Sequence, residues 1–171
     1  MHPTILQRLQ TARRRLLSVS GAAPIALLAL SLLGAAGPSG GAEFHATAES
    51  AVVMYDAPSL KAKPLFVLGR DYPVEVIVSV EGWLKVRDPG GTVAWVEKKS
   101  VGDKRMLVVR ASAADVHASP DPSAPVVFKA ESSVLLELLD PAYATSTPGW
   151  ARVRHRDGQT GYVRIQQVWG L

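Results

Sequence analysis

GWLKVRDPGGTVAWV, residues 82–96, recurs as GWARVRHRDGQTGYV, residues 149–163. A shift of 67 positions superimposes the two stretches and pairs Trp83 with Trp150. The same shift aligns Val86 with Val153, Arg87 with Arg154, Gly91 with Gly158, Trp95 with Tyr162 and Val101 with Val168. In each copy, two alternating apolar and polar runs flank a glycine-containing turn, which is the pattern of a β-hairpin. A repeat of this length at one spacing predicts a duplicated small β module.

Weaker matches extend the repeat toward the N-terminus. Residues 126–128 resemble 65–67 at a shift of 61, and Val134, Leu136 and Leu138 resemble the valines of 74–80 at a shift of 60. The change from 60 to 67 predicts a seven-residue insertion in the second copy, within residues 140–148 (DPAYATSTP). The matches divide the chain into module 1 (residues 43–102) and module 2 (residues 103–171).

Period-two patterns predict the strands of module 1. Residues 43–50 are expected to form an extended lead-in, 51–55 a strand, and 65–68 a short buried strand. Val74, Val76, Val78 and Val80 alternate with more polar residues, so we expect all four to face a core. The 82–96 hairpin then completes the module, and Val101 starts a final short strand.

Residues 1–42 have the layout of a secretory signal peptide. A basic region ends at Arg15, an apolar stretch covers 22–33, and a tract of small residues follows, with Ala36 and Ala42 as candidate cleavage positions. We favour cleavage after Ala42. The alternative is a retained anchor, but Pro24 leaves only nine residues before Gly34, too few for a membrane span of about 20. The arginines of residues 12–17 fit either general export or a twin-arginine signal.

The composition excludes several functions. The chain has no cysteine, so thiol nucleophiles, thiolate metal sites and disulfides are excluded. Four of the 19 basic residues lie before residue 16, and removal of the leader would leave 15 basic and 15 acidic residues. A neutral mature chain does not favour nucleic-acid binding. We expect no metal and no cofactor.

The module as a whole resembles the bacterial SH3-like (SH3b) domain. The resemblance rests on the turn with Pro58 and Ser59, the valine-rich strand, the Gly-Trp-x-x-Val motif and the Gly-x-x-(Gly/Ala)-(Trp/Tyr)-Val motif, each in two copies. It implies an all-β chain with two tandem small five-stranded barrels after an N-terminal signal helix. It also implies an exported periplasmic or envelope protein that binds a cell-wall glycopeptide. The arginine that the family often has before the Pro-Ser turn is missing from both copies.

Strand alternation suggests the ligand-binding residues. It places Trp83 and Arg87 on one face of their strand, and Trp150, Arg152 and Arg154 on one face of theirs. Aromatic rings flanked by cations could stack on a sugar or peptide and pair with carboxylates. The alternative is that the tryptophans close each barrel or fill the contact between modules. If a groove exists, Tyr55, Trp95 and Tyr162 are expected to line it.

Catalysis has little support in the sequence. Asp115 and His117 could share a strand face, but a metal site or a catalytic triad needs further convergent groups. We therefore expect a non-catalytic protein that recognises a peptidoglycan component or an envelope peptide. The alternative is an adaptor that docks onto another envelope protein and has no small ligand.

Overall fold

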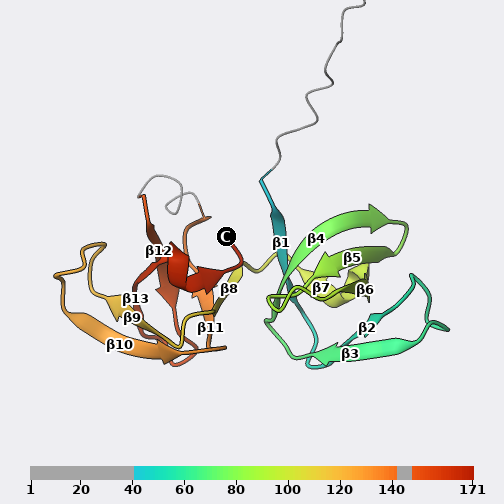
Figure 1. Cartoon of the computed structure of the whole chain (residues 1–171), viewed down its shortest axis with the longest axis horizontal. Helices are drawn as coiled ribbons and strands as arrows, with labels where there is room; N and C mark the ends of the chain where they lie inside the picture. The colour runs from blue at the N-terminus through green and yellow to red at the C-terminus, as the bar shows by residue number, and fades with distance from the viewer. Residues whose placement is uncertain (1–40, 142–147) are drawn as a thin grey trace, which may run out of the picture. The chain divides into compact units, whose positions relative to one another are not determined.

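The computed structural model describes residues 41–141 and 148–171 (Figure 1). They belong to one compact unit, Pro38–Leu171. The predicted signal helix lies outside the described residues, as does most of the predicted insertion. Among the residues that the structure describes, no helix has the length and hydropathy needed to cross a membrane.

Module 1 forms one antiparallel sheet, with a 3-10 turn, η1 (Lys98–Ser100), between its last two strands. Its strands are β1 (Glu43–Thr47), β2 (Val52–Tyr55), β3 (Pro64–Leu68), β4 (Pro73–Val80), β5 (Trp83–Arg87), β6 (Val93–Glu97) and β7 (Val101–Gly102). They are arranged in the order β3-β2-β6-β5-β4-β1-β7.

Module 2 repeats this sheet strand for strand. Its elements are β8 (Met106–Val109), β9 (Ala113–His117), β10 (Val126–Glu131), β11 (Leu135–Leu138), β12 (Trp150–Arg154), β13 (Thr160–Arg164), the 3-10 turn η2 (Ile165–Gln167) and β14 (Val168–Trp169). The order β10-β9-β13-β12-β11-β8-β14 matches that of module 1. The prediction of an all-β chain with two tandem modules is therefore confirmed.

Each module has seven strands instead of the five expected. The additional strands are the lead-in and the final short segment: β1 pairs with both β4 and β7, and β8 pairs with both β11 and β14. The lead-in becomes a strand because its backbone groups join a ladder that the sheet would otherwise leave open. Phe44 of β1 and Trp169 of β14 also meet edge to face, with ring centroids 4.9 Å apart.

The predicted offsets of 60 and 61 are wrong. Pairing to β5 and β12 makes Glu75 equivalent to Glu137, because each is opposite the arginine of its own module. Pairing to β2 and β9 makes Phe66 equivalent to Phe128. Both pairs give an offset of 62, which rises to 67 from Trp83 onward, so the second copy contains five additional residues and not seven.

The structure also corrects two burial predictions in module 1. Strand β3 is an edge strand, and Phe66 and Val67 are 54% and 65% exposed, so it is not the buried strand expected. In β4, Val74 is buried, but a register irregularity between Val76 and Val78 interrupts the alternation. A bulge of this kind re-aims the residues that follow it. As a result Val78 and Val80 are exposed instead of buried.

Each module has its own hydrophobic core. The core of module 1 contains Met54, Val74, Val86 and Val96 among others, and that of module 2 contains Leu107, Leu136, Val153 and Val163 among others. These side chains come from alternate positions of several strands. The outward positions between them are left for polar and aromatic residues.

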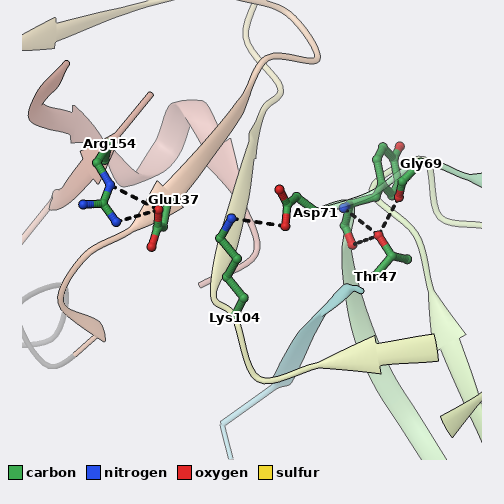
Figure 2. A network of polar contacts seen from close by, with 7 residues as sticks. Thr47, Gly69, Asp71, Lys104, Glu137 and Arg154 are labelled. Atoms are coloured by element: carbon green, nitrogen blue, oxygen red, sulfur yellow. Dashed lines mark hydrogen bonds and ion pairs between the residues drawn. The ribbon is translucent and has the colours of Figure 1, made fainter. Parts of the chain in front are cut away.

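One buried side chain supports the turn that leads into β4 (Figure 2). Thr47 is 1% exposed, and its hydroxyl donates a hydrogen bond to Gly69 O and accepts one of 2.8 Å from Tyr72 N. In module 2 the equivalent residue is Val109, and Val134 N donates directly to Glu131 O at 3.2 Å. The threonine therefore bridges two backbone groups that bond directly in the other copy.

We expect Thr47→Val to lower the free energy of unfolding by about 1–2 kcal/mol, because the partly buried Tyr72 N–H loses its acceptor. Chemical denaturation followed by tryptophan fluorescence measures the change. Val109→Ala, at the equivalent position, removes apolar contacts without removing a hydrogen bond and serves as the comparison. A Thr47→Val protein as stable as wild type would show that the turn closes directly, as it does in module 2.

Candidate functional site

Three aromatic residues gather on the outer face of module 1. Tyr55 packs edge to face against Trp83, with ring centroids 5.6 Å apart, and is directly opposite Trp95 in the ladder. Trp83 and Trp95 are both partly exposed, whereas Leu84 and Val86, which alternate with them on the hairpin, are buried. The hairpin thus divides into an inner face that fills the core and an outer face that carries the rings.

The bulge in β4 adds apolar side chains to this face. Val78 is opposite Lys85, and Val80 is opposite Trp83. Directly opposed residues in an antiparallel pair place their side chains on the same side of the sheet. The ammonium of Lys85 in turn lies 5.8 Å from the ring centroid of Trp95. The valines that sequence periodicity assigned to the core therefore extend the aromatic face.

An open groove of about 900 Å³ lies beside Trp83. It is lined by loop residues 58–61, by Gly82 and Trp83, and by residues 97–99 at the end of β6 and the start of η1. Within this lining, Lys99 Nζ forms an ion pair with Glu97 Oε2 at 2.7 Å. This contact raises the pKa of Lys99, first through the hydrogen bond to Glu97 and then through its charge. The volume of the groove is in the range of ligand-binding pockets.

Module 2 has equivalent residues around Trp150, but there the tryptophan is covered. His117 takes the place of Tyr55 and packs edge to face on Trp150 at 5.4 Å. Arg164 takes the place of Glu97, and its guanidinium carbon lies 4.2 Å from the ring centroid of Trp150. Trp150 is only 4% exposed. The two copies therefore share a framework but differ in access to the tryptophan.

Comparison with known families agrees with this duplicated architecture. The model of the bacterial SH3 domain matches residues 48–103 and again residues 111–170, more than half of the chain. The chain belongs to the bacterial SH3 domain family. Bacterial SH3 domains are typically cell-wall binding modules, and they are often found in exported proteins.

Other comparisons add little beyond the family. No curated protein matches the chain. Among solved structures, NlpC2 and NlpC1 from Trichomonas vaginalis are 18% and 20% identical, with TM-scores of 0.34 and 0.35, over 75% and 81% of this chain. An NlpC/P60 family protein from Bacillus cereus ATCC 10987 is 14% identical with a TM-score of 0.34 over 74%. The chain spans 48%, 50% and 56% of those three proteins, in the order NlpC2, NlpC1 and Bacillus protein.

The two candidate arginines at equivalent positions of the SH3 modules are held by ion pairs. Arg87 donates to Glu75 at 2.8 Å, and Arg154 donates to Glu137 at 2.9 Å (Figure 2 shows the second pair). Arg152 is exposed on β12, directly opposite Tyr162 of β13. The site residues predicted for module 2 thus share the outer face of its hairpin, but the structure seals Trp150 beneath Arg164.

The groove of the first SH3 module includes residues that the sequence analysis missed. Glu97, Lys98 and Lys99 line it, and Lys61 reaches it from the loop after β2. A signal was present, because the 67-residue repeat aligns Glu97 with Arg164 and so reverses a charge next to the tryptophan. The strand pairing shows why the reversal matters, because Glu97 is directly opposite Trp83 and Arg164 is directly opposite Trp150.

Each histidine that the structure describes contacts a carboxylate or a carbonyl oxygen. His45 lies 2.9 Å from Glu43, His155 lies 2.9 Å from Asp157, and His117 Nδ1 is 2.9 Å from Ala124 O. Hydrogen bonds from Gln159 N and His155 lower the pKa of Asp157. Across residues 41–141 and 148–171, no group of three or more histidine or acidic residues is placed to hold a metal ion.

Proposed function

We propose that this chain is an exported, non-catalytic binding protein whose first SH3 module recognises a peptide of the bacterial cell wall. The observation that carries the proposal is the open groove beside Trp83, bordered by the aromatic face of β5 and β6. The family supports cell-wall binding in general. Export rests on the leader within residues 1–42, with the mature chain starting after Ala36 or Ala42.

The groove offers two kinds of contact. Trp83 and Leu60 supply apolar surface for the flat or aliphatic parts of a peptide. Lys61 and Lys98 stand on its rim and can pair with carboxylates. These lysines take the role that the sequence suggested for Arg87, Arg152 and Arg154. Arg87 and Arg154 already have acidic partners, and Arg152 belongs to module 2. The proposal needs no cofactor and no metal.

We expect Trp83→Ala to weaken retention of the mature protein on purified sacculi by about tenfold, because the stacking surface of the groove is lost. Co-sedimentation at low and high salt measures it, and screening should weaken only the share of binding that comes from the lysines. Phe66→Ala removes an exposed aromatic ring on β3, outside the groove residues, and serves as the matched control.

The control separates two outcomes. Loss of retention in Trp83→Ala with normal retention in Phe66→Ala supports the groove. Equal retention of wild type and Trp83→Ala contradicts it. Thermal unfolding of both variants shows whether either one has lost its fold.

An adaptor function has one observation in its favour. Strand β3 lies at the edge of its sheet and exposes Leu65, Phe66 and Val67. An edge strand with exposed apolar side chains can accept a strand or an apolar surface from a partner protein. Absence of wall retention, together with recovery of one stoichiometric envelope protein that Phe66→Ala releases, would favour the adaptor.

A further inference from the structure

One position of the repeat carries opposite charges in the two modules. Trp83 is directly opposite Glu97, and Trp150 is directly opposite Arg164. Opposed residues of an antiparallel pair lie on the same side of the sheet. Each tryptophan therefore has one charged cross-strand neighbour, which is an anion in module 1 and a cation in module 2.

In module 2 the cation covers the indole. The guanidinium carbon of Arg164 is 4.2 Å from the ring centroid of Trp150, within the range of a cation–π contact. Module 2 thus contains an aromatic ring with a cation on it, both from its own chain.

In module 1 the ring and the carboxylate are present on the wall of an open groove. Glu97 and Trp83 both line it, and Trp83 is partly exposed. The carboxylate of Glu97, whose side chain is 18% exposed, pairs with Lys99, whose side chain is 75% exposed. Because the lysine end of this pair is in solvent, Lys99 can leave the carboxylate at little cost. A cation brought by a ligand can therefore replace Lys99 at Glu97 and lie on the indole as well.

We propose that module 1 binds a primary ammonium group of its ligand between the indole of Trp83 and the carboxylate of Glu97, where module 2 has its own Arg164. This inference rests on the proposed function and narrows the ligand to a wall peptide with a free side-chain amine. The carboxylates of the same peptide pair with Lys61 and Lys98. Module 2 is closed to this ligand because Arg164 already fills the equivalent place.

The test compares untreated sacculi with sacculi whose amines have been acetylated, a reaction that removes the positive charge. Wild-type mature protein is expected to bind acetylated sacculi about tenfold more weakly. Glu97→Arg, which gives module 1 the residue of module 2, is expected to bind untreated sacculi about tenfold more weakly than wild type. Glu97→Gln keeps the shape of the side chain and is expected to lose most of the preference for untreated sacculi.

Two controls assign the effect to module 1. Glu131→Gln changes an exposed acid on β10 and should leave both retention and amine preference unchanged. Trp83→Ala should remove the amine preference, because module 2 remains closed. Thermal unfolding identifies any variant that does not fold, and Glu97→Gln is the milder variant if Glu97→Arg fails.

The failures can be told apart. Equal wild-type retention on treated and untreated sacculi overturns the ammonium site and leaves the proposed wall-binding function standing. Failure to sediment with either preparation overturns the function and this inference together. An amine preference that survives in Trp83→Ala overturns the assignment to module 1.

Discussion

Trp150→Ala is expected to lower the free energy of unfolding by about 3–5 kcal/mol, the usual cost of truncating a buried large aromatic side chain. Trp150 is 4% exposed and contacts both the ring of His117 and the guanidinium of Arg164. Its removal leaves a void and takes away the surface on which both partners rest. The loss falls on module 2, whose core is separate from that of module 1.

Urea denaturation of the mature protein, followed by circular dichroism, measures this loss. Trp83→Ala is the matched variant, because it removes the equivalent but partly exposed ring of module 1. It should cost clearly less stability than Trp150→Ala while weakening wall binding more. Equal losses of stability from the two variants would contradict the difference in burial between the modules.

Gly161→Ala is expected to destabilise module 2 by about 1–3 kcal/mol through overpacking. A Cβ at this position would lie 2.6 Å from Val116 Cγ1 and 2.7 Å from the carbonyl oxygen of His117. The second atom belongs to the backbone of the neighbouring strand β9, so relief requires the strands to separate. The equivalent residue of module 1 is Ala94, which is buried without difficulty.

Gly69→Ala is the control for this prediction, because a Cβ at residue 69 would meet nothing within 4 Å. Its equivalent in module 2 is Glu131, which shows that the fold accepts a side chain there. The shift in the midpoint of thermal unfolding compares the two variants. A Gly161→Ala protein with the midpoint of wild type would show that strands β9 and β13 can separate at no cost.

The closed tryptophan of module 2 also changes which residues test wall binding. Trp150 and Arg154 were candidates from sequence alone, but one is buried and the other pairs with Glu137. Their replacement would report mainly on folding. Trp83 and Glu97 are both partly exposed and both line the open groove, so their replacement reports on binding.

The local pattern of the sequence was enough to predict the fold class and the duplication. A hairpin that begins with Gly-Trp, turns at glycine and ends at an aromatic residue specifies its own pairing, because only a few residues separate the two strands. The division of the hairpin into two faces also followed from alternation alone. Alternation separated Trp83 from Leu84 and Val86, but it left open whether the tryptophans close the barrel or face outward, and the structure places Trp83 and Trp95 on the outer face.

The register between distant strands was decided only by the tertiary structure. A period-two pattern looks the same after a shift of two residues, so Val74 could be matched to Val134 or to Leu136 with equal success. Cross-strand pairing selects Leu136, and the β4 bulge turns Val78 and Val80 outward. Within each hairpin, Arg164 covers Trp150, whereas Glu97 at the equivalent position leaves Trp83 partly exposed. The period-two pattern shows which residues share a strand face, whereas the burial of that face depends on which other parts of the chain pack against it.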